Sequence, residues 1–266
     1  MLKKRISEIY TPHVFSIPPE ATVDDAVRLM REEGISCVLV LDNGRPLGIF
    51  TERSIVHAAD RHGDDFGHQP VSSHMSTPVV TASAEMHAYE AFNLLHVKKL
   101  RHLVVVDEAG RAMGVVTQSN LVEHLGAEYF VEVRKLSQIM VRTVVTVPPD
   151  VLVRQAAAIM TAALISCLVV VVEDRPVGII TERDLARLLT DQAKGQDKPV
   201  AELMSQPVLT ASMNTPIHSA MELMRRRRVR RLVVVDRERR LRGLITQSDL
   251  VNALEWHYIE ILKEII

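Results

Sequence analysis

The sequence has few cysteines and few aromatic residues, and each shortage limits what the chain can be. Cys37 and Cys167 are its only two cysteines, and they form no CxxC pattern, which argues against a disulfide scaffold or a zinc site and fits a reducing cytoplasm. Both follow a serine within an apolar segment, so we expect buried thiols. Aromatic residues make up 4% of the chain and hydrophobic residues 47%, so the core must be aliphatic.

Long apolar runs and a charge excess are also missing. No stretch reaches the roughly 18 apolar residues of a membrane span, and no signal-length apolar run follows the basic residues 1–6. A net charge of −1 gives no general attraction to nucleic acid or anionic membranes. The chain contains no Walker loop, HExxH pattern or Ser/His/Asp order. We therefore expect a soluble cytoplasmic protein that is not an enzyme and has no metal site.

One short segment occurs four times. It reads Gly-Ile-Phe-Thr from Gly48, Gly-Val-Val-Thr from Gly114, Gly-Ile-Ile-Thr from Gly178 and Gly-Leu-Ile-Thr from Gly243. The copies are about 65 residues apart, which indicates an internal repeat. Repeats one and three share Ile-Ser-Cys, Pro-Pro and Thr-Glu-Arg, whereas repeats two and four share Leu-Val-Val-Val-Asp and Thr-Gln-Ser. The chain therefore resembles a two-repeat unit that was duplicated.

Each repeat has the same predicted order of elements. In repeat one, a short strand holding Ser16 precedes a helix over residues 22–33, which Gly34 ends. A strand over 36–41, a tight turn at 42–44 and a strand over 47–50 lead to a second helix from Thr51. The polar stretches 60–73 and 190–199 are expected to be loops between repeats.

This β-α-β-β-α order, with Gly-hydrophobic-x-Thr-x-x-Asp before the last helix, resembles the cystathionine β-synthase (CBS) domain over nearly the whole chain. The resemblance implies an α/β (α+β) fold in which four repeats pair into two Bateman modules, packed as a flat pseudo-symmetric disk like the gamma subunit of AMP-activated protein kinase. The first module would span 1–136, with repeats 7–60 and 72–128. The second would span 137–266, with repeats 137–190 and 200–256 and a C-terminal helix.

The resemblance also implies a function. Members of this family bind AMP, ADP, ATP or S-adenosylmethionine between paired repeats, and many regulate an attached enzyme or transporter. We expect an adenosine-nucleotide-binding regulatory module, forming a homodimer and signalling to a partner or a fused output domain, with S-adenosylmethionine a less favoured ligand. The alternative is a dimerisation scaffold with degenerate sites. The apolar helix after Asp249, which contains Trp256, would either pack the disk and the dimer or dock on the output partner.

The Thr-x-x-Asp motif allows two interpretations. Thr181 with Asp184, and Thr246 with Asp249, could simply cap the helices that they begin. The same positions could instead present backbone N–H groups to a phosphate and a carboxylate to ribose hydroxyls, and the family resemblance favours this role. Repeats one and two have a neutral residue in place of the acid, which should weaken ribose binding roughly ten- to hundredfold.

Basic residues just before the second strand of a repeat are the expected phosphate contacts, and hydroxyls fill the matching positions elsewhere. The run 225–228 is instead expected to be a solvated helix end. The tighter ribose and phosphate sites are predicted at Thr181, Asp184, Thr246, Asp249, Thr146, Thr210, Arg230, Arg231 and Ser166. The weaker or degenerate sites are predicted at Thr51, Ser54, Thr117, Asn120, Arg101 and His102.

Overall fold

The structure is a computed structural model that describes residues 4–62, 66–125, 135–189, 197–250 and 253. Each repeat forms a three-stranded sheet in which the first strand pairs parallel and the third antiparallel with the central one. The same order recurs in the second half of the chain. The predicted class of four β-α-β-β-α repeats is therefore confirmed.

The first half contains β1 (Ser16–Ile17), α1 (Val23–Glu32), β2 (Cys37–Asp42), β3 (Arg45–Thr51) and α2 (Glu52–His62), then β4 (Thr81–Ser83), α3 (Ala88–Val97), β5 (His102–Val106), β6 (Ala112–Thr117) and α4 (Gln118–Leu125). The second half contains α5 (Leu136–Ile139), β7 (Thr146–Val147), α6 (Val153–Ala163), β8 (Cys167–Val172), β9 (Arg175–Thr181) and α7 (Glu182–Leu189), then β10 (Thr210–Ser212), α8 (Ile217–Arg227), β11 (Arg231–Val235) and β12 (Leu241–Thr246). Short 3-10 turns lie at Ile6–Glu8, Val71–Ser73 and Val200–Glu202.

Local chemistry explains the boundaries of these elements. Thr22 caps α1 and exchanges hydrogen bonds with Asp25, while Gly34, with φ of 65°, ends the helix as expected. Asn43 and Gly44 both have positive φ and make the tight turn between β2 and β3. The loop expected over 60–73 is wrong at both ends, because α2 continues to His62 and residues 71–73 form a 3-10 turn.

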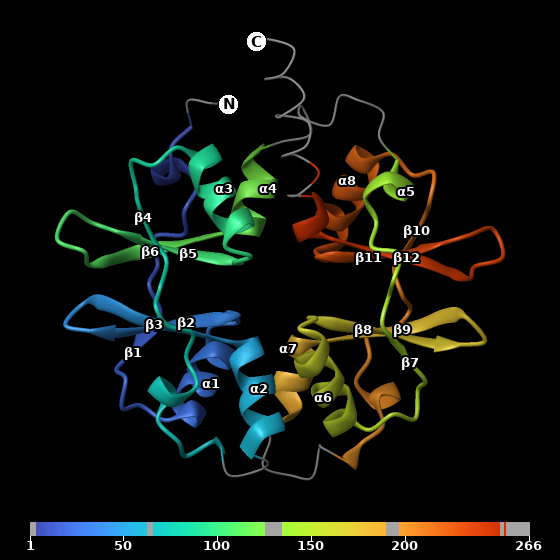
Figure 1. The fold of residues 1–266 in the computed structure, drawn as a ribbon, viewed down its shortest axis with the longest axis horizontal. Helices are drawn as coiled ribbons and strands as arrows, with labels where there is room; N and C mark the ends of the chain where they lie inside the picture. Colours follow the sequence, from blue (N-terminus) through green and yellow to red (C-terminus); the bar gives the residue numbers. More distant parts are fainter. Residues whose placement is uncertain (1–3, 63–65, 126–134, 190–196, 251–252, 254–266) are drawn as a thin grey trace.

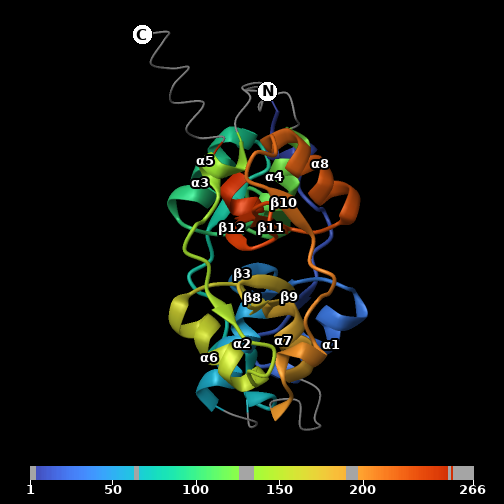
Figure 2. The same ribbon diagram turned by 90° about the vertical axis from the view of Figure 1, so that its right-hand side faces the viewer.

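The four repeats surround a common centre in a flat disk (Figure 1), which is seen edge-on in Figure 2. Repeats one and two meet through their sheets, as do repeats three and four, where Cys167, Val169 and Val233 share one buried cluster. Helices join the other pairs. α2 packs on α7 and α6, and one core cluster combines α3 with α8. Each repeat therefore contacts two neighbours around the disk.

The segments that precede each repeat cross to the neighbouring repeat. The arm before β1 bridges Arg5 to His87 and Thr11 to Val115, in repeat two. The segment before β4 crosses in the opposite direction, because Ser76 bridges to Ile49 in repeat one. The second half repeats this pattern with bridges such as 141 to 244 and 179 to 205.

Three sequence-based expectations have mixed outcomes. Cys167 is buried, but Cys37 is only partly so. The loop expected over 190–199 and the helix expected after Asp249 fall largely outside the described residues. Within the described ranges, no helix is both long and apolar enough to cross a membrane.

Candidate functional site

Each Thr-x-x-Asp motif lies where a third strand turns into a second helix. The carboxylate Oδ2 atom of Asp184 accepts hydrogen bonds from the backbone N–H of Thr181 at 2.9 Å and from its hydroxyl at 2.7 Å. Asp249 accepts the same pair from Thr246, both at 2.7 Å. The capping interpretation is thus correct as geometry. The contacts from described residues all reach Oδ2, so capping fixes each carboxylate in one orientation.

The motifs of repeats one and two keep the cap but lack the charge. Asn120 accepts through Oδ1 from the N–H and hydroxyl of Thr117, at 2.9 and 2.7 Å. Ser54 makes longer contacts, at 3.2 Å to the N–H of Thr51 and 3.4 Å to its hydroxyl. The four helix starts therefore have one geometry but differ in the charge that they present.

A cavity of about 160 Å³ at the centre of the disk receives side chains from all four repeats. Eight of the predicted residues line it: Thr51, Arg101, His102, Thr117, Ser166, Arg230, Arg231 and Thr246. Glu52 and the Gln-Ser pairs at 118–119 and 247–248 also line the cavity. The other seven predicted residues are not in its wall: Asp184, Asp249, Thr181, Thr146, Thr210, Ser54 and Asn120. The structure thus gathers the predicted basic residues from opposite sides of the disk.

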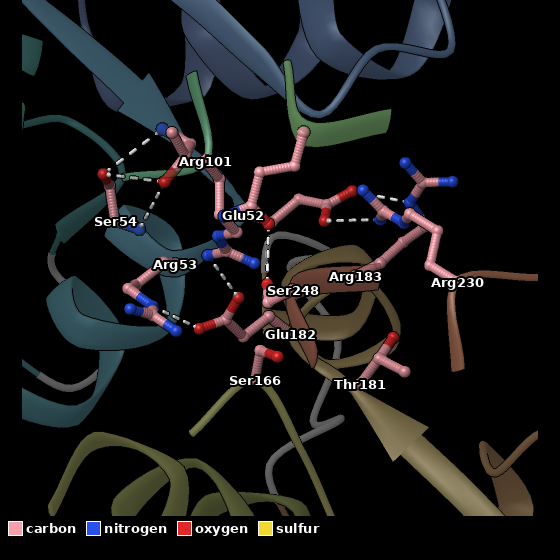
Figure 3. Close-up of polar contacts among 12 residues, drawn as sticks. Glu52, Arg53, Ser54, Arg101, Ser166, Thr181, Glu182, Arg183, Arg230 and Ser248 are labelled. Atoms are coloured by element: carbon pink, nitrogen blue, oxygen red, sulfur yellow. Dashed lines mark hydrogen bonds and ion pairs between the residues drawn. The ribbon is translucent and has the colours of Figure 1, made fainter. Parts of the chain in front are cut away.

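Two reciprocal ion pairs join the neighbouring repeats one and three beside this cavity (Figure 3). Arg53 Nε lies 2.6 Å from Glu182 Oε1, and Arg183 Nε lies 2.6 Å from Glu52 Oε1. These glutamates belong to the Thr-Glu-Arg segments of repeats one and three. Because each arginine pairs with the glutamate of the other repeat, the starts of α2 and α7 are joined twice.

The same glutamates also receive the arginines that were expected to bind phosphate. Arg101 of repeat two donates to Glu182 at 2.9 Å, and Arg230 of repeat four lies 3.8 Å from Glu52. The side chain of Glu182 is only 4% exposed. Burial acts to raise the pKa of Glu182, but Arg101 and Arg53 outweigh it and hold that pKa below its ordinary value.

Repeats two and four make a neutral version of this contact. Ser119 donates to Gln247 at 2.7 Å, and Ser248 donates to Gln118 at 2.6 Å. The alternation of Thr-Glu-Arg and Thr-Gln-Ser therefore corresponds to two kinds of reciprocal contact. Sequence reasoning missed both, although the charge complementarity within the shared segments was a usable signal.

Arg231 is placed differently from Arg230. Its Nη2 atom donates to the hydroxyl of Ser166 at 2.8 Å and to its carbonyl at 3.2 Å. Arg231 and Ser166 were predicted as separate phosphate contacts, but they bind each other between repeats four and three. The buried Nε–H group of Arg231 remains without an acceptor among the described residues.

His102, in the cavity wall, and Asp249, outside it, both have displaced pKa values. Burial, together with Arg101 and Arg230, lowers the pKa of His102 to about 3, so the ring is neutral at pH 7 and adds no positive charge there. Burial also raises the pKa of Asp249 despite the two hydrogen bonds from Thr246. Among the described residues, no three His, Cys, Asp or Glu side chains are grouped so as to hold a metal ion.

The motif glycine is explained by close packing. A Cβ at Gly48 would lie 2.1 Å from the sulfur of Met75, and one at Gly178 would lie 2.1 Å from the sulfur of Met204. Both methionines belong to the segments that cross between paired repeats. The recurring glycine therefore leaves room for the crossing segment beside the strand that ends at the motif threonine.

Comparison with known proteins agrees with this internal repetition. The model of the family described as "CBS domain" matches residues 6–61, 71–127, 136–191 and 200–255. The uncharacterized protein MJ1404 of Methanocaldococcus jannaschii is 24% identical over 99% of the chain. An inosine-5'-monophosphate dehydrogenase of the same organism is 38% identical over 45% of the chain. The chain spans 64% of the first relative and 23% of the second.

Solved structures share the arrangement. Protein MJ1225 of Methanocaldococcus jannaschii, described as a candidate archaeal homolog of g-AMPK, superposes with a TM-score of 0.84 at 22% identity. The match covers 94% of this chain and 99% of that one. An uncharacterized conserved protein of Pyrococcus horikoshii matches with a TM-score of 0.64 at 23% identity, over 94% of this chain and 100% of that one. At these identities the comparison shows the fold.

Proposed function

The chain belongs to the CBS domain family, and we propose on this basis that it is a regulatory module without catalysis of its own, which binds an adenosine nucleotide. The observation that carries the proposal is the pair of oriented carboxylates at Asp184 and Asp249. A carboxylate held in one orientation loses little further freedom when it accepts hydrogen bonds from ribose hydroxyls. Repeats three and four therefore supply the tighter sites.

The phosphate end of the ligand would meet the arginines around the central cavity. Arg231 offers an Nε donor without a partner among the described residues, and Arg230 is held by a glutamate at 3.8 Å. AMP, ADP and ATP differ in charge and length at this end, so these arginines would discriminate among them. S-adenosylmethionine brings no phosphate and is the less favoured ligand.

The readout would follow from the cross-disk contacts. A ligand shifts a conformational equilibrium only by binding the two states with different affinity. Phosphate that attracts Arg230 weakens its contact with Glu52, and Glu52 also holds Arg183 at the start of α7. Ligand binding would thereby alter the packing of α2 on α7, with coupling of about 1–3 kcal/mol. The proposal includes cytoplasmic modules spanning 1–136 and 137–266, a homodimer, and an output partner or fused domain.

Isothermal titration with AMP, ADP, ATP and S-adenosylmethionine tests the ligand assignment. Asp184→Asn and Asp249→Asn keep the cap, as Asn120 does, but remove the charge, so each should weaken binding at its own site by about tenfold or more. Asp150→Asn, at an exposed loop position, serves as the matched control. Unchanged affinity in both site variants would show that the ribose assignment is wrong.

A scaffold is the second candidate function, and one observation favours it. Arg101 and Arg230 already pair with carboxylates, and Arg101 does so at 2.9 Å with a buried glutamate. These pairs hold the disk together without any ligand. Purification without bound nucleotide, together with no thermal shift from any of the four ligands, would support the scaffold and contradict the nucleotide module.

A further inference from the structure

A second cavity lies beside α2 in repeat one and shares no residue with the central cavity. Its volume is about 230 Å³. It is bordered by α2 on one side and by the segment that crosses from repeat two on the other. Its lining residues are Arg53, Ser54, His57, Ala58, Arg61, Ser73, His74, Met75 and Ser76.

The wall of this cavity is rich in hydrogen-bond donors and contains no carboxylate. Arg53 pairs with Glu182 across the disk, whereas Arg61 makes no ion pair with another residue that the structure describes. His74 is fixed by a contact of 2.7 Å between its Nε2 and Gln69 Oε1. Arginine forks, imidazoles and hydroxyls together are the donor types that bind oxyanions.

The matching region of repeat three keeps arginines but adds carboxylates. The bridges from Ile49 to Ser76 and from Ile179 to Ser205 align the two crossing segments. In that alignment, Ser73 corresponds to Glu202, and Ser54 corresponds to Asp184. Repeat one thus has hydroxyls at two positions where its duplicate has carboxylates.

An imidazole also replaces an apolar side chain. His74 occupies the position of Leu203 in repeat three, and the methionine that follows is kept as Met75 and Met204. These three differences make repeat one more favourable to an anion, whereas a fourth, His57 in place of Arg187, acts in the opposite direction. The absence of an acid at Ser54 therefore coincides, in the same cavity, with the absence of a second carboxylate at Ser73 and the presence of an imidazole at His74.

We propose that the cavity beside α2 binds the phosphoryl group of a small anion, through Arg61, His57, His74 and the surrounding serines. This site is independent of the proposed adenosine sites in repeats three and four. Its position connects it to the rest of the disk, because Arg53 lies between the cavity and Glu182. An anion that attracts Arg53 would compete with one of the two reciprocal ion pairs.

The two histidines provide a direct spectroscopic readout. Burial lowers the pKa of His57, as do Arg53 and Arg61, while Glu182 and Asp60 act to raise it. Burial also lowers the pKa of His74, as do His62 and Arg61. A bound dianion favours the protonated rings, so phosphate should raise both pKa values in a histidine-selective NMR titration.

Titration calorimetry with inorganic phosphate and with glycerol phosphate tests the site and separates free from organic phosphate as the ligand. Ser54→Asp restores the residue found in repeat three, together with its capping geometry, so the protein should stay folded while phosphate affinity falls by about tenfold or more. Arg61→Gln should produce a loss of similar size. Arg227→Gln, at an exposed position of α8, is the matched control and should bind as wild type.

The outcomes separate this proposal from the adenosine proposal. Ser54→Asp should leave binding at Asp184 and Asp249 intact, and Asp184→Asn should leave phosphate binding at repeat one intact. Thermal unfolding of each variant verifies that it is folded. The proposal is overturned if millimolar phosphate gives neither heat nor a histidine shift, or if binding persists unchanged in both Ser54→Asp and Arg61→Gln.

Discussion

Arg53 and Glu182 are 129 residues apart in the sequence, yet their side chains meet at 2.6 Å across the disk. Arg101 binds the second oxygen of the same carboxylate at 2.9 Å. One buried glutamate of repeat three therefore holds arginines from repeats one and two. We therefore expect this residue to stabilise the disk more than an exposed ion pair does.

Replacing Glu182 with Gln should destabilise the folded chain by about 3 kcal/mol, because two partly buried arginines lose their countercharge. Equilibrium unfolding in urea measures this loss. Glu222→Gln breaks an exposed pair with Arg226 on α8 and should have little effect. Equal effects of the two changes would contradict a structural role for the cross-disk pair.

Stability should depend on the protonation of His102 below neutral pH. The folded-state pKa is about 3 and the ordinary value is 6.5, so between these values the unfolded chain binds a proton that the folded chain does not. Stability then falls as pH falls, by about 2 kcal/mol from pH 7 to pH 5. His102→Gln should remove this part of the slope in urea unfolding at several pH values. If the free energy of unfolding changed with pH equally in the wild type and the variant, the pKa of His102 in the folded chain would be an ordinary one.

Gly178→Ala should destabilise repeat three by about 1–3 kcal/mol through overpacking. The new methyl group would lie 2.1 Å from the sulfur of Met204 and 3.0 Å from its Cβ. Shortening the neighbour in the double variant Gly178→Ala/Met204→Ala should recover part of the loss. Thermal unfolding of the two single variants and the double variant completes a double-mutant cycle. If the two losses of stability simply added in the double variant, the two side chains would not compete for space.

Glu52→Gln should increase the affinity for phosphate-bearing nucleotides. Glu52 holds Arg183 at 2.6 Å and Arg230 at 3.8 Å, so under the proposed function its carboxylate would compete with phosphate for these cations. We expect AMP to bind about three- to tenfold more tightly, whereas adenosine should bind as before. Calorimetry with both ligands provides the comparison, and weaker AMP binding would mean that Glu52 supports the site instead of competing with it.

The repeat and its elements were predictable because they rest on local chemistry. The helix cap at Thr22, the turn at Asn43-Gly44 and the spacing of the motif glycines are all contained in short stretches of sequence. The orientation of Asp184 toward Thr181 was likewise predictable, because both lie within one helical turn. Periodicity and capping act over a few residues, so one sequence contains them fully.

The partners of the arginines were not predictable in the same way. Arg101 and Arg230 were interpreted as phosphate contacts, but each also faces a glutamate from the other half of the chain. Such contacts depend on how four repeats assemble around a centre, which local patterns do not specify. The cavity beside α2 was missed because its residues come from a helix and from a segment that crosses between repeats.

Because the arms cross between repeats, one sequence repeat is not a complete folding unit by itself. The arm that begins repeat one completes repeat two through Thr11 and Val115, and the arm that begins repeat two completes repeat one through Ser76 and Ile49. A single repeat copied alone would leave one arm without an acceptor and one strand edge uncovered. Duplication of a whole pair keeps every arm with its acceptor, which agrees with the two-repeat period of this sequence.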